Sequence, residues 1–162
     1  AGVTHTAAYH HFKDKHALLA QIAMEGFVLL DKRMVEAMDA AAPADPIERL
    51  MASGGGYLRM AQEDPQAYDL MFNGLQFDRG DPQVFHQTAK RPFERLVAAV
   101  AAARAHSGRT RGDLMVDALV TWEIVHGAAM LMRAGHFDRM NISREGHWRY
   151  IGDVLRGMYT PG

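Results

Sequence analysis

The 162-residue sequence contains no cysteine, which excludes a disulfide framework and any metal site built on thiolate ligands. It also has no long apolar run, because the longest, from Leu96 to Ala103, is far too short to cross a bilayer. The formal net charge is −1, so any contact with nucleic acid must be local rather than spread over the whole chain. These absences predict a soluble, cytoplasmic protein with no membrane partner.

Helical periodicity dominates what is present. No segment alternates apolar and polar residues like a half-buried strand, and every long segment repeats its apolar residues with the period of a helix. Asp-Pro pairs at 45–46, 64–65 and 81–82 combine an N-cap with proline at the first helical position. Asp14, Asp113 and Ser143 are further caps. The sequence therefore predicts an all-α fold of about seven helices, near 4–11, 14–41, 46–63, 66–72, 81–106, 113–134 and 143–159.

Two features interrupt these helices. Gly54, Gly55 and Gly56 lie inside the helix at 46–63, where each glycine costs up to about 1 kcal/mol relative to alanine. We expect a kink or a close helix crossing there; the alternative is that the missing side chains leave room for a ligand. Pro92 should bend the helix at 81–106, because proline cannot donate the backbone hydrogen bond of a helix interior.

The opening stretch, "AGVTHTAAYHHFKDKHALL", predicts a very short helix that begins after Thr4 as its N-cap. A helix of about two turns is not stable by itself and needs support from its neighbours. It carries polar side chains that can hydrogen-bond, and two lysines flank the start of the next helix. This arrangement is typical of a recognition helix with phosphate contacts around it, and equally of a capped turn between core helices.

The same stretch resembles the second half of the helix-turn-helix of TetR-family transcriptional regulators, whose pattern is roughly A-G-V-[ST]-x-x-x-[LI]-Y-x-[HY]-F-x-[SDN]-K-x-x-L. The matching residues are Ala1, Gly2, Val3, Thr4, Tyr9, His11, Phe12, Asp14, Lys15 and Leu18. Ala8 departs from the larger apolar residue usual at its position. The resemblance implies phosphate contacts from Tyr9, His11 and Lys15. It also implies that His5, Thr6 and His10 face the bases of operator DNA.

Two later segments resemble the ligand-binding part of a TetR subgroup: "YLRMAQEDPQAYDLMF" at 57–72 and "TWEIVHGAAML" at 121–131. Trp122, His126 and Gly127 match the subgroup's Trp…His-Gly signature. The resemblance implies two parts, residues 1–20 as the end of a DNA-binding domain and 21–162 as a ligand-binding and dimerisation domain. Because the family's first helix and most of its second have no counterpart here, we expect an N-terminally truncated regulator.

The function implied is that of a ligand-responsive transcriptional regulator, a repressor that a small apolar or amphipathic effector releases from operator DNA. We expect no cofactor. The expected pocket residues are Tyr57, Met71, Phe72, Phe85, Phe93, Trp122, His126 and Met130. Each of them is also explained as a core residue. His126 in particular is either a ligand contact or a buried neutral imidazole bonded to backbone or tyrosine.

The last two helices predict a homodimer. The helix at 113–134 carries few charges, so it must be covered on more than one side. Together with the helix at 143–159 it would form a four-helix bundle with a second copy. The residues expected at this interface are Trp148, Ile151, Leu155 and Met158.

Catalysis and metal binding are not expected. His10 and His11 are adjacent and so lie on different helix faces, and Glu123-x-x-His126 is only half of a di-iron motif without a second copy. The rival hypotheses are a helical ligand-binding or scaffold protein without DNA contact and, more remotely, a di-metal helical-bundle oxidase.

Overall fold

The computed structural model describes residues 15–41, 45–73 and 82–159, and in these ranges the chain is helical without a strand. The helices are α2 (Lys15–Ala40), α3 (Pro46–Glu63), α4 (Pro65–Asn73), α5 (Pro82–Ser107), α6 (Leu114–Arg133), α7 (His136–Arg139) and α8 (Arg144–Tyr159). The prediction of an all-α fold is confirmed. The short helix expected at 4–11 lies outside the described residues.

Local capping sets the helix boundaries. The Asp45 carboxylate accepts hydrogen bonds from the amides of Ile47 at 2.9 Å and Glu48 at 3.3 Å. Asp113 caps α6 in the same way. These side chains satisfy amide groups that the first turn of a helix leaves without partners, which is why the predicted starts are correct. The one-turn helix α7 was not expected; it follows Gly135, whose φ of 69° lies in the left-handed region.

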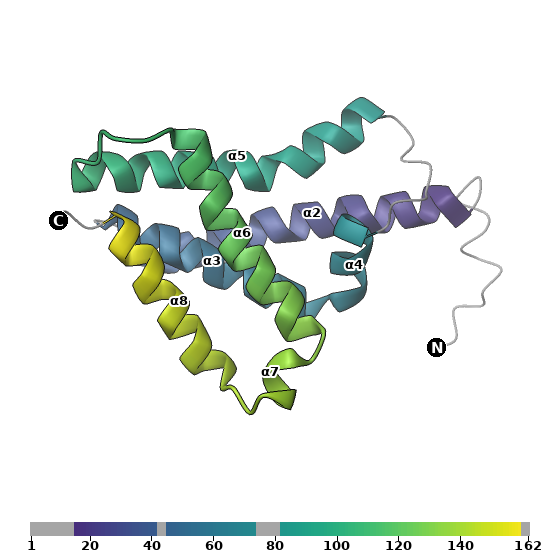
Figure 1. The fold of residues 1–162 in the computed structure, drawn as a ribbon. Helices are drawn as coiled ribbons and strands as arrows, with labels where there is room; N and C mark the ends of the chain where they lie inside the picture. Colours follow the sequence, from purple (N-terminus) through teal and green to yellow (C-terminus); the bar gives the residue numbers. More distant parts are fainter. Residues whose placement is uncertain (1–14, 42–44, 74–81, 160–162) are drawn as a thin grey trace.

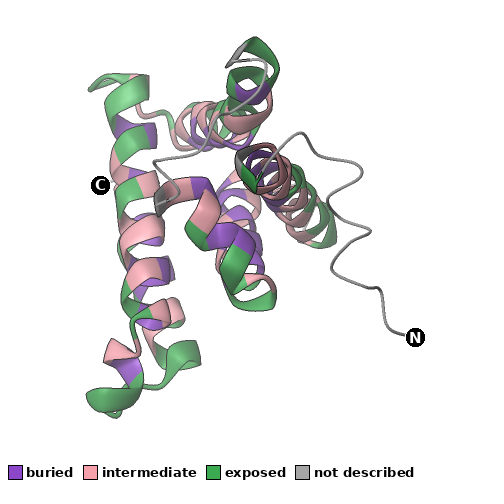
Figure 2. Ribbon diagram, turned by 90° about the vertical axis from the view of Figure 1, so that its right-hand side faces the viewer, coloured by how far each residue is buried: buried purple, intermediate pink, exposed green. Residues whose placement is uncertain are grey.

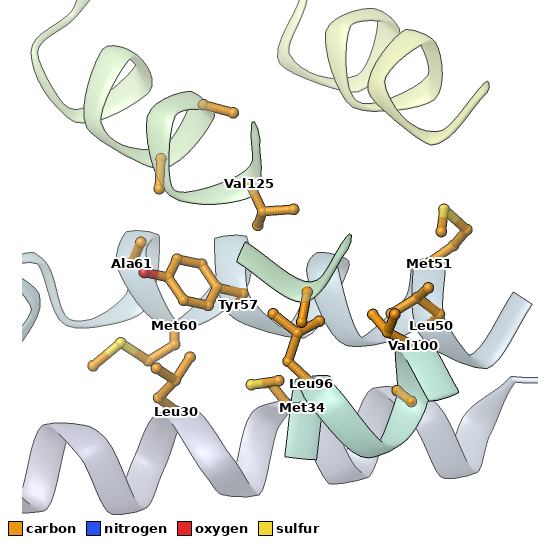
Figure 3. Packing of buried hydrophobic residues seen from close by; sticks show 14 of the residues in the cluster. Leu30, Met34, Leu50, Met51, Tyr57, Met60, Ala61, Leu96, Val100 and Val125 are labelled. Atoms are coloured by element: carbon orange, nitrogen blue, oxygen red, sulfur yellow. The ribbon is translucent and has the colours of Figure 1, made fainter. Parts of the chain in front are cut away.

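The core lies where α2, α3, α5 and α6 meet. Leu30 and Met34 of α2, Tyr57 of α3 and Leu96 of α5 point into this space (Figure 3). Figure 2 shows buried residues on the inward sides of the helices and exposed residues on their outer sides. α6 and α8 lie in front of α3, and α7 joins their ends (Figure 1).

The glycine triplet of α3 marks a close helix crossing. A Cβ atom built on Gly56 would lie 2.8 Å from the carbonyl carbon of Arg33 and 3.0 Å from the Cα of Met34, both in the backbone of α2. A Cβ on Gly54 would lie 2.6 Å from the ring of Trp148 in α8. Helix α3 continues through the triplet, so the crossing interpretation is correct for Gly54 and Gly56.

Pro92 lies inside α5, which the structure continues on both sides of it. In the view of Figure 1 the two halves of α5 do not share one axis. Proline has no amide hydrogen, so the carbonyl of Thr88 has no helical donor at this point. The bend agrees with the one expected from the sequence.

Ion pairs connect the helices at their edges. Asp117, which is 6% exposed, lies between two arginines: Arg104 contacts one carboxylate oxygen, and Arg109 donates to both at 3.1 Å. Arg109 also donates to the carbonyl of Met158 at 2.7 Å. This network ties the connection between α5 and α6 to the end of α8.

Helix α6 is long and apolar enough to cross a membrane by length and composition alone. It is the one such helix among the described residues. Core helices of globular proteins pass the same test, and α6 contains the buried Asp117. This feature therefore does not indicate a membrane protein.

The crossing at Gly56 gives a stability prediction with a control one residue away. Gly56→Ala should lower the free energy of unfolding by about 2 kcal/mol, because the new Cβ meets backbone atoms that cannot move independently. Gly55→Ala should raise it by up to about 1 kcal/mol, because a Cβ there meets only ordinary contacts with Trp148, the nearest at 3.8 Å. Urea unfolding at one fixed protein concentration measures both. Equal effects of the two substitutions would contradict the crossing.

Candidate functional site

A small apolar cavity of about 60 Å³ lies between α2, α3, α4, α5 and α6. Its wall consists of Phe27, Leu30, Met34, Tyr57, Phe72, Ala89, Pro92, Phe93, Leu96 and Trp122. A second space of about 20 Å³ lies next to it and shares Met34, Tyr57, Leu96 and Trp122. Neither wall includes a formally charged side chain, so this interior suits an uncharged, largely apolar molecule.

The polar centre beside the cavity consists of two tyrosines and a histidine from three different helices. The hydroxyl of Tyr57 lies 2.7 Å from Nδ1 of His126, and the hydroxyl of Tyr68 lies 2.9 Å from the same nitrogen. The two hydroxyl oxygens are 3.1 Å apart. Because each hydroxyl can donate one proton and also accept one, the three groups satisfy one another without a charged partner.

The environment keeps these three groups uncharged. Burial raises the pKa of the Tyr57 hydroxyl, and it raises the pKa of Tyr68 to about 12. Burial also lowers the pKa of the His126 imidazole below its ordinary value. Near neutral pH the centre therefore offers hydrogen bonds and no net charge.

Aromatic rings surround the polar centre. The ring of Phe72 lies 4.7 Å from that of His126 in an edge-to-face arrangement, and Trp122 lies 5.3 Å from it. Phe93 extends the cluster toward α5, 5.9 Å from Trp122. Rings at these distances attract one another in tilted and edge-to-face geometries, so the cluster forms a stiff wall. The site can thus accept a flat apolar group, with Tyr57 as the polar group in the wall.

Comparison with known proteins assigns the chain to a family. Residues 50–155 match the model described as tetracyclin repressor-like, C-terminal domain, which spans more than half of the chain. The chain belongs to this TetR-like family. Two of the segments that carry the resemblance, at 57–72 and 121–131, lie inside the matched range, and the opening stretch lies outside it. The prediction of a family of transcriptional regulators, which are generally not enzymes, is therefore confirmed at that level.

Solved structures resemble the TetR-like chain over most of its length. A protein of unknown function from Rhodococcus sp. RHA1 is similar with a TM-score of 0.81 and 26% identity, over 96% of this chain and 79% of that chain. A candidate regulatory protein, SCO4313, has a TM-score of 0.71 and 21% identity, over 95% of this chain and 79% of that chain, which shows a shared fold. No curated protein matches the chain.

The predicted pocket residues fall into two groups in the TetR-like structure. Tyr57, Phe72, Phe93 and Trp122 line the cavity. His126 does not line the cavity, and its Nδ1 lies within hydrogen-bonding distance of the two tyrosine hydroxyls. The other three pack elsewhere: Met71 packs against Gly26, Phe85 contacts Phe27, and Met130 is partly buried against the core.

The sequence analysis missed the contribution of α2 to the cavity. Phe27, Leu30 and Met34 line it, and all three have the helical spacing expected of core residues. Periodicity identifies such a face but not where the packing on it leaves a void. Tyr68 was also missed as a partner of His126, although it lies in the quoted segment at 57–72.

The residues expected at a dimer interface instead face the core of their own chain. Ile151 and Leu155 are 7% and 1% exposed. Trp148 and Met158 are partly buried against the same core. Helical spacing correctly identified an apolar face of α8, but that face is covered by the subunit itself. The outward face of α8 carries Tyr150 and Val154, at 67% and 45% exposure.

Of the predicted DNA contacts, His5, Thr6, Tyr9, His10 and His11 lie outside the described residues. Lys15 is the first residue of α2 and is exposed. Within the described ranges, no group of three or more potential metal ligands comes together. Glu123 is exposed, whereas Nδ1 of His126, three residues later, is engaged by the tyrosines.

The shared imidazole predicts a non-additive effect of removing the two hydroxyls. Tyr57→Phe and Tyr68→Phe should each lower the free energy of unfolding by about 1 kcal/mol, because Nδ1 keeps one hydroxyl partner in either variant. The double variant should cost at least about 1 kcal/mol more than the sum, because Nδ1 then lacks both. Denaturant unfolding of all three variants measures this; Tyr150→Phe, at an exposed position, is the control. Purely additive costs would show that the two hydroxyls do not share the nitrogen.

Proposed function

We propose that this TetR-like chain acts in a ligand-responsive DNA-binding regulator, a repressor that a small apolar or amphipathic molecule releases from operator DNA. One observation carries the proposal: the cavity is walled by α2, the helix that begins directly after the opening recognition motif. The division into a DNA-binding part at 1–20 and a ligand-binding and dimerisation part at 21–162 belongs to the same proposal.

The argument from cavity to DNA depends on the stiffness of α2. Its 26 residues form one uninterrupted helix, about 39 Å long at 1.5 Å per residue. Protein interiors are close-packed, so a molecule larger than the cavity must displace part of its wall. A displacement at Phe27 or Leu30 is carried along the helix to Lys15 at its start, which is next to the residues proposed to contact DNA.

The wall composition supports an uncharged effector. A molecule buried here meets aromatic rings and aliphatic side chains, and an ionised group would lose its hydration without gaining a counter-charge. A hydroxyl, ketone or amide could replace one of the hydrogen bonds that Tyr57 makes. An aromatic or aliphatic molecule with one such polar group fits both features.

A homodimer is part of the proposal, on a surface different from the one first expected. Most of the large hydrophobic side chains that are exposed in the described structure lie in and after α6: Met115, Val116, Leu119, Leu131, Met140, Ile142, Tyr150 and Val154. α6 and α8 lie together in front of the other helices (Figure 1). Covering this surface with the same surface of a second copy would bury the apolar side chains of both.

The cavity proposal predicts a variant that binds operator but resists the effector. Ala89→Leu places a larger apolar side chain in the cavity wall, so the effector concentration for half-release should rise at least about tenfold. Operator affinity without effector should stay the same. A gel-shift assay measures the release. It uses operator DNA that the full-length protein has selected and tests a panel of uncharged aromatic compounds as effectors. Ala98→Leu, on the exposed face of α5, is the control, and equal behaviour of both variants would contradict the proposal.

The dimer proposal predicts that a charge on the outward face of α6 separates the subunits. Leu119→Glu, at a side chain 38% exposed, should give a monomer that keeps its helix content, because the carboxylate would be buried without a partner. Val28→Glu, at 54% exposure on α2, should leave the oligomeric state unchanged. Light scattering and circular dichroism on both variants measure this. Leu155→Glu tests the subunit core and should unfold it. If the Leu119→Glu variant remains a dimer, the interface does not include this face of α6.

A further inference from the structure

A second hollow lies on the other side of Trp148 from the apolar interior. It is an open cleft of about 250 Å³ bounded by α3, α6, α7 and the start of α8. Its lining is Gly55, Leu58, Arg59, Gln62, Ala128, Met132, Phe137, Arg144, Glu145, His147 and Trp148. On α3 the spacing of 55, 58, 59 and 62 places these residues on one helix face. The cleft is therefore built by continuous helix surfaces.

Gly55 forms the floor of the cleft, and packing gives no reason for a glycine there. Its neighbours in the triplet are required by contacts, Gly56 with α2 and Gly54 with Trp148. A Cβ on Gly55 would meet nothing closer than 3.8 Å. A helix-interior glycine costs about 1 kcal/mol relative to alanine. Its effect here is a flat floor that leaves the cleft open.

One cation at the cleft is not neutralised by contact. The guanidinium of Arg59 makes no ion pair or hydrogen bond with any described residue. Glu36 on α2, whose pKa the charge of Arg59 helps to lower, and Glu63, one turn after Arg59 on α3, are both held by Arg33, at 2.8 Å and 2.7 Å. Arg59 is therefore available to a ligand.

The other charged groups of the rim are already paired. Arg144 lies 3.1 Å from Asp138, and Glu145 lies 3.4 Å from Arg149. His147 faces the ring of Phe137, with the ring centres 4.4 Å apart. The indole N–H of Trp148 donates to no described residue, and the ring borders the floor at Gly55. The rim thus offers one free cation and one free neutral donor above an apolar floor.

We propose that this cleft binds a small amphipathic carboxylate, with its anionic group on Arg59 and its apolar part on Phe137, Met132 and the face of Trp148. Guanidinium groups bind carboxylates through two parallel charge-assisted hydrogen bonds, and the open side of the cleft lets water hydrate the remaining lone pairs. The site differs in chemistry from the internal cavity, whose wall carries no charge. Trp148 is shared, because its ring also lines the smaller internal space beside Gly54.

The test uses 3-phenylpropionate and its uncharged amide on the full-length protein, by isothermal titration calorimetry. The carboxylate should bind at least about tenfold more tightly than the amide, since only the carboxylate forms charge-assisted bonds. Arg59→Gln should weaken carboxylate binding by about the same factor and leave binding of the amide unchanged. Gly55→Leu, which fills the floor, should abolish binding of both. Arg91→Gln, at an exposed arginine on α5, is the control for the loss of a positive charge.

Each alternative outcome is decisive. Equal carboxylate binding by wild type and Arg59→Gln, or no measurable binding by wild type, would overturn the proposal. Loss of carboxylate binding in Ala89→Leu would place the molecule in the internal cavity and overturn it too. The two proposals are tested by different variants. If effectors fail to release operator DNA, the proposed function is contradicted and the cleft proposal is unaffected. If Arg59→Gln does not change carboxylate binding, only the cleft proposal is contradicted. Circular dichroism checks that Gly55→Leu folds, and Arg59→Gln carries the test if it does not.

Discussion

The contact between the backbones of α2 and α3 at Gly56 determines much of the rest of the structure. With no side chain between them, the two helices lie so close that the rotation of α3 about its axis is fixed. That rotation sends Tyr57 toward α6 and the cavity, Gly54 under the ring of Trp148, and Gly55 toward the open cleft. The four consecutive residues from Gly54 to Tyr57 therefore face four different environments, and a small turn of α3 would disturb all of them.

The polar centre at His126 shows how the interior holds a histidine without charge. The two tyrosine hydroxyls satisfy its nitrogen, and burial keeps the ring neutral. The polar groups around His126 thus have hydrogen-bond partners without any ligand. A molecule that enters the cavity must therefore make contacts more favourable than those it disturbs. A purely apolar molecule leaves the three hydrogen-bonded groups in place, whereas one with a polar group can exchange with Tyr57.

The sequence predicted the helix boundaries, which depend on local hydrogen bonds. It did not predict the position of the cavity or the burial of α8, which depend on how the helices pack. The carboxylates of Asp45, Asp64 and Asp113 accept hydrogen bonds from amides two or three residues away, so these residues located the helix starts from sequence alone. The family was identified from the opening stretch and from two later segments, at 57–72 and 121–131, and only the later two lie inside the matched range. The apolar face of α8 was visible in its spacing, but spacing does not distinguish a subunit core from an interface between copies. For the same reason the void next to Phe27, Leu30 and Met34 could not be located before α5 was placed against α2.

Pro92 has a consequence for kinetics. It lines the cavity together with Ala89 and Phe93, in the part of α5 that lacks one hydrogen bond of the helix. The cavity is only about 60 Å³, so a larger molecule fits only when a wall moves, and the half of α5 before Pro92 has fewer helical hydrogen bonds that resist such a movement. For the effector proposed above, we expect the rates of entry and escape to depend on this half-helix and the affinity to depend on the rings of Phe72, Phe93 and Trp122. In the proposed regulator, residence time and affinity would thereby be set by different parts of the same wall.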